Sequence, residues 1–206
     1  MDAQTCLQKM KLAGTLAMAT VDADGSPQIR CVSAVHYEPD AVYFFTARGK
    51  EMTRQLMSDG RIQTMVHTRF NEMIRMSGVA KPAADVEQGM WIDTIFAEQP
   101  YLANVYPGDT RNIGIVFKVQ DIALDYFNLG VHPIERAVFS LSGNAELARA
   151  KGYRINAETC IGCGTCLAHC PQKCIVEGDA YHIEPEHCLH CGACAQACPV
   201  SAVERL

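Results

Sequence analysis

Two nearly identical runs of cysteine constrain this chain more than any other feature of its sequence. In each run three cysteines are separated by two residues each, a fourth follows after three more, and a proline closes the run. The two runs comprise Cys160, Cys163, Cys166, Cys170 and Pro171, and then Cys188, Cys191, Cys194, Cys198 and Pro199. Thiols at these spacings could hold iron–sulfur clusters, and the alternatives are a zinc site or a disulfide-linked module.

The spacing favours iron–sulfur clusters over those alternatives. Zinc sites usually take paired C-x2-C ligands, whereas this duplicated run closed by proline is the bacterial iron–sulfur pattern. A [4Fe–4S] cluster needs four thiolates; the tight loop supplies three, and in two-cluster proteins the fourth comes from the other run. We therefore predict one cluster held by Cys160, Cys163, Cys166 and Cys198, and a second held by Cys188, Cys191, Cys194 and Cys170.

The sequence around these motifs resembles a known family over the whole C-terminal part of the chain. From Gly152 to Leu206 the sequence resembles two-cluster bacterial ferredoxins, which implies a small α+β ferredoxin-like domain over residues 152–206. Three cysteines lie outside the pattern. We expect Cys6 and Cys31 to be small core thiols and Cys174 to be structural, since the set of eight ligands is already complete.

The first 127 residues alternate between strand-like runs and turns. The strands expected from this pattern are Thr15–Val21, Gln28–Val35, Ala41–Thr46, Ile62–His67, Met73–Val79 and Ile113–Leu124, and the helices are Ala3–Leu12, Glu51–Ser58 and Asp85–Glu98. About six strands at hairpin-like spacings with few helices predict a mainly β domain, an antiparallel barrel, over residues 1–127. Residues 128–151 are predicted to connect it to the ferredoxin-like domain.

Three short blocks give this N-terminal part a second resemblance. They read L-A-M-A-T-V-D-A-D-G-S-P-Q-I-R-C-V-S-A-V, then V-Y-F-F-T-A-R-G-K-E-M-T-R-Q-L, then I-R-M-S-G-V-A. From Leu12 to Phe127 the chain resembles the pyridoxamine 5'-phosphate oxidase-like family of FMN-binding split barrels. The resemblance implies a homodimer with FMN in the groove between subunits. The family residues carried over to this sequence as FMN-binding are Arg30, Cys31, Val32, Ser33, Thr46 and Lys50.

The chemistry of these residues agrees with the resemblance, with one departure. A phosphate dianion binds cationic side chains, hydroxyl groups and the free N–H groups at a helix start, and Thr46 and Lys50 precede a predicted helix. The oxidase itself usually has an Arg-Lys pair there, where this chain has Glu51 and Met52. That difference argues against vitamin B6 oxidation. Arg30 and Lys50 could also be solvated surface charges, and Thr46 a plain strand residue.

Composition excludes several other classes of function. The net charge of −5 argues against a nucleic-acid binder, and no apolar run is long enough for a membrane span. The start of the chain has no basic, apolar leader, so we expect a cytoplasmic protein in which thiols stay reduced. Residues 152–206 carry three basic and six acidic residues. Such an acidic module can dock a basic redox partner protein, although it could equally be a plain soluble surface.

Two classes of function follow from the two resemblances. The first is an FMN-dependent iron–sulfur oxidoreductase that passes electrons between an external low-potential donor, two [4Fe–4S] clusters, FMN and a small organic substrate. The second is a dimeric ferredoxin-type electron carrier whose barrel is only a scaffold. A third possibility keeps the barrel but fills it with haem or a deazaflavin. The sequence identifies neither a catalytic acid or base, nor the substrate, nor the direction of electron flow.

Overall fold

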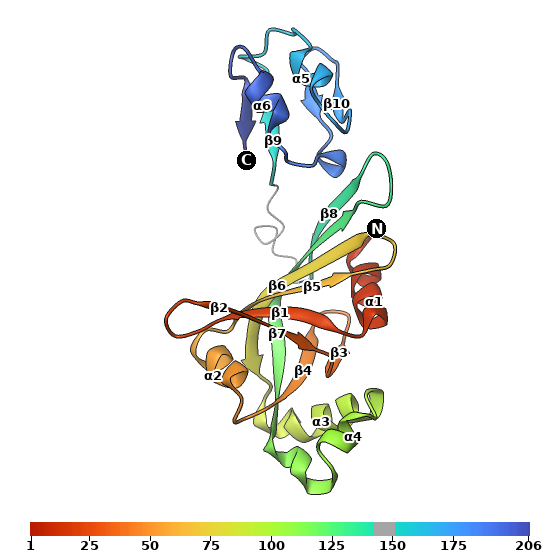
Figure 1. Ribbon diagram of the computed structural model, residues 1–206, viewed down its shortest axis with the longest axis vertical. Helices are drawn as coiled ribbons and strands as arrows, with labels where there is room; N and C mark the ends of the chain where they lie inside the picture. Colours follow the sequence, from red (N-terminus) through yellow and green to blue (C-terminus); the bar gives the residue numbers. More distant parts are fainter. Residues whose placement is uncertain (142–150) are drawn as a thin grey trace. The chain divides into compact units, whose positions relative to one another are not determined.

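The computed structural model describes residues 1–141 and 151–206, which form two compact units (Figure 1). The first unit comprises Met1–Thr68, Met73–Asp125 and a stretch that begins at Phe139. The second comprises Arg69–Glu72, Tyr126–Val138 and the chain from Lys151 to Leu206. Part of the predicted connection, residues 142–150, lies outside the described residues.

A sheet of eight strands is the framework of the N-terminal part. The strands are β1 (Leu16–Val21), β2 (Pro27–Val32), β3 (Val35–Tyr37), β4 (Val42–Ala47), β5 (Arg61–His67), β6 (Glu72–Pro82), β7 (Gly114–Asn128) and β8 (Glu135–Ser140). Their order is β2-β1-β5-β6-β7-β4-β3, with β8 paired to β7. The pairs β1–β2, β1–β5, β3–β4, β4–β7 and β5–β6 are antiparallel. The prediction of a mainly β split barrel with few helices is confirmed.

Two details of the strands differ from the prediction. The strand expected over Gln28–Val35 is broken, because β2 pairs with β1 as far as Val32 and β3 starts a new pairing with β4 at Val35. No glycine or proline marks this change of partner. Strand β8 lies in the segment predicted to be a connection, and its half-exposed residues show no clear alternation.

The helices begin and end where local signals indicate. Helix α1 (Ala3–Ala13) is capped by Asp2, whose carboxylate accepts a hydrogen bond from the Thr5 N–H at 2.7 Å, and it ends at Gly14 with φ of 73°. Helix α2 (Glu51–Ser58) has its predicted bounds. In the described part of the chain, no helix is both long and apolar enough to cross a membrane.

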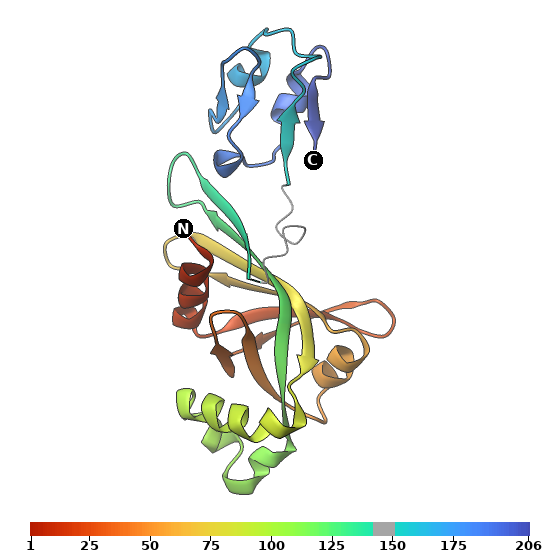
Figure 2. The same ribbon diagram turned by 180° about the vertical axis from the view of Figure 1, so that it is seen from behind.

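The helix predicted over Asp85–Glu98 forms as a 3₁₀ turn, η1 (Asp85–Glu87), followed by α3 (Gln88–Glu98). The buried side-chain amide of Gln88 accepts from the Val116 N–H at 2.8 Å and donates to the carbonyls of Val116 and Ala83 at 3.0 and 2.9 Å. This amide fixes the start of α3 to β7. Next come α4 (Leu102–Val105) and the turn η2 (Gly108–Ile113), and Figures 1 and 2 show α3 and α4 side by side at one end of the sheet.

The second unit contains short elements arranged in two similar halves. Strand β9 (Tyr153–Ile155) pairs with β12 (Val203–Arg205), and β10 (Ile175–Val176) pairs with β11 (His182–Ile183). Two short helices, α5 (Thr165–Ala168) and α6 (Ala193–Ala197), each begin inside a cysteine run, and a turn, η3 (Pro185–His187), precedes the second run. The predicted small α+β domain is confirmed.

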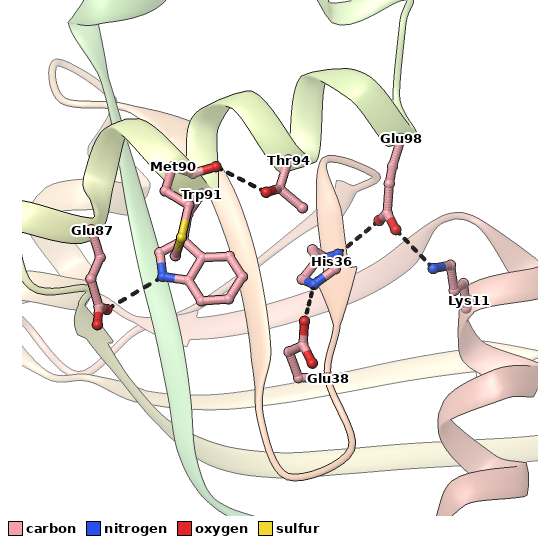
Figure 3. Close-up of polar contacts among 8 residues, drawn as sticks. All are labelled: Lys11, His36, Glu38, Glu87, Met90, Trp91, Thr94 and Glu98. Atoms are coloured by element: carbon pink, nitrogen blue, oxygen red, sulfur yellow. Dashed lines mark hydrogen bonds and ion pairs between the residues drawn. The ribbon is translucent and has the colours of Figure 1, made fainter.

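A buried histidine ties α1, β3 and α3 together (Figure 3). His36 is 8% exposed; its Nδ1 lies 3.0 Å from a Glu98 oxygen and its Nε2 lies 2.7 Å from a Glu38 oxygen. The other oxygen of Glu98 accepts from Lys11 Nζ at 3.0 Å. The indole ring of Trp91 packs beside the imidazole, with ring centroids 5.5 Å apart. Although burial opposes its ionisation, the hydrogen bonds from His36 and Lys11 lower the pKa of Glu98.

We expect the substitution Glu98→Gln to destabilise the first unit by about 0.5–1 kcal/mol at neutral pH, because it removes a partly buried ion pair. A carboxylate whose pKa is lowered by folding adds stability above its unfolded pKa, and that stability is lost as the pH falls through its folded pKa. The difference between wild type and variant should therefore disappear in acid. Urea unfolding at several pH values measures it. Asp93→Asn, which removes the exposed pair with Arg111, is the control and should change stability less; equal effects would contradict the assignment.

Candidate functional site

Four of the predicted cluster ligands line one cavity of the second unit. They come from the first run and from the end of the second: Cys160, Cys163, Cys166 and Cys198. The rest of the lining is mostly apolar, and it includes Ile155, Val200 and Ala202. Thiolate sulfurs in an apolar shell are the donor set that an iron–sulfur cluster requires, so these residues fit a [4Fe–4S] cluster.

The other four predicted ligands line a second cavity: Cys170, Cys188, Cys191 and Cys194. The structure thus brings the eight cysteines together in the two groups expected from the sequence, and the ligand bonds themselves remain a prediction. Cys174 lies in the same cavity, with its sulfur 3.6 Å from that of Cys170. Burial, and then its contact with Cys170, raise the pKa of the Cys174 thiol.

A glycine and a tyrosine shape each cysteine loop in the same way. Gly164 and Gly192 have φ of 72° and 79°, which favours glycine at both positions. A Cβ at Gly164 would lie 3.1 Å from the Tyr181 hydroxyl, and one at Gly192 would lie 2.8 Å from the Tyr153 hydroxyl. Each tyrosine therefore fits against its loop only because the residue beside it is a glycine, which has no side chain.

The first unit contains a larger cavity of about 500 Å³, a size typical of small-molecule sites. It lies where β2 and β4 end and where α2 and α4 begin. All six residues predicted to bind FMN line it: Arg30, Cys31, Val32, Ser33, Thr46 and Lys50. The expectation that Cys31 is a core thiol is wrong, because its side chain is exposed at this cavity.

One end of this cavity has the groups that a phosphate needs. Thr46 is 2% exposed, and within the described part of the chain its Oγ1 is buried with no hydrogen-bond partner. Such orphaned hydroxyls are rare and call for a missing partner. Lys50 occupies the N-cap position of α2, where free backbone N–H groups and the helix dipole favour an anion. These residues fit the phosphate end of FMN.

Arg30 lines the same cavity, but neighbouring side chains hold its guanidinium. Its Nη2 donates to Gln55 Oε1 at 2.9 Å, and its Nη1 donates to the Thr20 hydroxyl. Gln55 and Thr20 are 4% and 2% exposed, so the contacts lie inside the barrel. Burial lowers the pKa of this arginine, which remains charged at neutral pH. Sequence reasoning missed both neighbours, because neither is adjacent to Arg30 in the chain.

The other end of the cavity is aromatic and apolar, and its residues were not predicted. They are Phe45, Tyr101, Leu102, Val105 and Tyr106. The Tyr101 hydroxyl lies 2.6 Å from Ser33 Oγ, and the ring of Tyr106 packs edge-on against Phe45, with centroids 5.2 Å apart. Most of these residues come from the segment around α4, between the predicted helix Asp85–Glu98 and the predicted strand Ile113–Leu124. The only signal in the sequence was its pair of tyrosines, which did not point to a site.

Comparison with known protein families matches both parts of the chain. A family model described as pyridoxamine 5'-phosphate oxidase matches residues 4–123, and one described as a 4Fe-4S dicluster domain matches residues 152–199. A pyridoxine/pyridoxamine 5'-phosphate oxidase of Rhodopseudomonas palustris is 29% identical over 91 residues, which are 44% of this chain and 41% of that protein. One from Aeromonas hydrophila is 35% identical over 63 residues, 31% of this chain and 30% of that protein. The matched segment thus covers less than half of either relative.

Solved structures resemble the barrel at low sequence identity. A NimC/NimA family protein of Clostridium acetobutylicum has a TM-score of 0.56 at 17% identity, covering 66% of this chain and 90% of that one. A pyridoxamine 5'-phosphate oxidase-related, FMN-binding protein of Nostoc punctiforme has a TM-score of 0.51 at 16% identity, covering 66% and 87%. At such identities the likeness shows the fold alone.

We expect Thr46→Val to weaken FMN binding by about tenfold or more, because a hydrogen bond to a charged group is lost. Titration of the flavin-free protein with FMN, followed by fluorescence quenching, gives the dissociation constant. Thr15→Val, at an exposed threonine that does not line the cavity, is the matched control. Equal affinities of T46V and T15V, with equal thermal stability, would contradict the phosphate role.

The pairing of cysteines can be tested by combining substitutions. Cys163→Ala and Cys198→Ala should each remove about half of the iron, and together no more than either alone, because both are expected to hold one cluster. Cys163→Ala combined with Cys170→Ala should remove nearly all of it. Iron analysis and the electron paramagnetic resonance of the reduced protein measure the result. Cys174→Ala is the control and should retain both clusters.

Proposed function

Because the chain belongs to the pyridoxamine 5'-phosphate oxidase family and carries a 4Fe-4S dicluster domain, we propose that it is a reductase supplied by its own clusters. In this proposal an external redox protein gives electrons to the two clusters, and FMN passes them to a small organic substrate. The chain is an iron–sulfur flavoprotein whose cofactors are two [4Fe–4S] clusters and a flavin. One observation carries the proposal. A single chain has two cysteine-lined cavities and a third cavity with an orphaned hydroxyl at its cationic end.

The two kinds of cofactor complement each other when they are bound: clusters supply electrons singly, and a flavin can collect two for an organic substrate. Joining both modules in one chain replaces a bimolecular encounter by a high effective concentration. In the barrel, Thr46 and Lys50 would hold the phosphate of the flavin, and Arg30 would add positive charge nearby. Tyr101 and Tyr106 line the apolar end of the cavity and would exclude water from it.

The start of α2 argues for a substrate other than a B6 vitamer. Glu51 and Met52 stand where the oxidase usually has its Arg-Lys pair, and the carboxylate of Glu51 forms an ion pair with Arg54. The chain thus lacks, at this position, the cationic pair that is usual in the oxidase. The curated relatives are named as oxidases of pyridoxine and pyridoxamine phosphates, but the aligned segment covers only 41% of the first. We therefore propose a small reducible compound other than a B6 vitamer.

The remaining parts of the proposal concern organisation and location. We propose a flavin domain over residues 1–127 and a cluster domain over residues 152–206, joined by residues 128–151. We propose a homodimer, as in the split barrels that the sequence resembles, and a cytoplasmic location. The cytoplasmic location is supported by the cysteines, eight of which are expected to ligate iron. Thiols that must ligate iron are kept reduced in that compartment.

The substitution Cys163→Ala should abolish reduction of the bound flavin by a ferredoxin-type donor, because it removes a ligand on the proposed route. The measurement is the bleaching of flavin absorbance under anaerobic conditions, with Cys174→Ala as the control. Flavin reduction that survives unchanged in a variant shown to have lost that cluster would refute the route. Iron and sulfide without flavin, even after reconstitution with FMN, would instead support the electron carrier.

A further inference from the structure

The duplicated cysteine loops allow a direct comparison of two surfaces within one unit. In the first loop, Ile161 follows the leading cysteine and is 64% exposed. Its equivalent in the second loop, Leu189, is half-buried. The leading cysteines differ in the same direction, since Cys160 is half-buried and Cys188 is 8% exposed. The two loops share a sequence pattern, so the difference must come from what covers them.

The segment Tyr126–Val138, which belongs to the same compact unit, covers the second loop. Its Ile134 is 4% exposed, and the Ile134 N–H donates to Gln172 Oε1 at 3.0 Å. The Ile134 carbonyl lies 2.8 Å from His187 Nδ1, which donates to it. Two backbone groups of one buried residue thus bind His187, which immediately precedes the second loop, and Gln172, which lies two residues after Cys170.

Arg136 adds a third contact, this time with the loop itself. Its Nη1 lies 3.2 Å from Nδ1 of His190, the residue between Cys188 and Cys191. An arginine can only donate, so this ring nitrogen accepts. The guanidinium also lies over the ring of Phe127, 5.0 Å from its centroid, which holds it in place. The second loop therefore carries a fixed positive charge on its covered side.

The first loop has neither feature at the equivalent positions. Thr159 and Gly162 replace His187 and His190, and both are exposed. Two exposed carboxylates lie near the first loop. Glu158 precedes it by two residues. Glu177 interacts with Tyr181, whose hydroxyl lies beside Gly164 of the loop. The surface around the first loop therefore combines the exposed apolar side chain of Ile161 with the negative charge of Glu158 and Glu177.

We propose that this surface, formed by Ile161, Cys163 and the carboxylates of Glu158 and Glu177, is the docking site for the external redox protein. The partner that fits it is a protein with basic residues around an apolar contact close to its own redox centre, because opposite charges steer the encounter and Ile161 provides the dry contact. Each transfer moves one electron: the partner is oxidised by one electron, the chain is reduced by one, and no bond forms or breaks. The proposal rests on the proposed function and specifies its partner.

Mitochondrial cytochrome c, a small basic haem protein, is a suitable probe, with electrons running from the reduced chain to the haem. The measurement is the second-order rate constant for reduction of cytochrome c by the anaerobically reduced full-length protein. Ile161→Lys should lower this constant at least tenfold at low salt, since it replaces the apolar contact by a charge of the same sign as the probe. The wild-type constant should fall as salt is added, and Glu158→Gln with Glu177→Gln should weaken that dependence.

The controls separate docking from other effects. Val86→Lys introduces the same charge at a side chain that is 93% exposed in the first unit, and it should leave the constant within twofold of wild type. A neutral quinone, which needs no charged surface, should oxidise I161K as fast as wild type. An unchanged constant for I161K with full iron content would overturn the docking site. A flavin that stays oxidised while the clusters are reduced would instead overturn the proposed function and leave this comparison intact.

Discussion

The bonding of cysteine thiolates to the iron of two clusters, with eight cysteines as the expected ligands, is the interaction on which the C-terminal part of the structure depends. Its strands are two or three residues long and its helices four or five, too short to be stable alone. Its buried cluster consists of Cys166, Ile175, Tyr181 and Cys194, so half of these side chains are predicted ligands. Natural domains of this small size often add a metal or disulfides to a limited apolar core. The clusters therefore both define the function of this segment and supplement its small apolar core.

The barrel is stabilised instead by the burial of apolar side chains, and its cavity lies where the chain changes its strand partner. The chain leaves the pairing with β1 after Val32 and joins β4 at Val35. Ser33 and Ala34, at this change of partner, both line the cavity. Because the sheet opens there, the end of β4 and the start of α2 can present Thr46 and Lys50 to the same space. Helix α3, pinned by Gln88, sets the position at which α4 brings Tyr101 opposite Ser33.

The sequence predicted those parts of the structure whose signals are local. Helix α2 was placed at its observed bounds because Met52 and Leu56 repeat at helical spacing, and the cysteine loops were found because their ligands lie within eleven residues of one another. The break between β2 and β3 was missed, since it is decided by strands elsewhere in the sheet. The partners of His36 were missed for the same reason: Glu98 lies 62 residues further along the chain. Long-range contacts of single side chains leave no periodic trace in one sequence.

The duplication in the second unit also shows how a repeat can become asymmetric without changing its own motif. Two equivalent loops would give two equivalent surfaces, and a redox protein could exchange electrons with either. The difference here arises outside the loops, at Ile134 and Arg136, and within them at the change from Gly162 to His190. A glycine at the first position offers no side chain to bind, whereas the histidine accepts a hydrogen bond from a cation. In this proposal, the loop that exposes Ile161 meets the external protein, and the loop that Arg136 contacts does not. A direction of transfer through two similar clusters can thus come from their coverage, without any difference in their ligands.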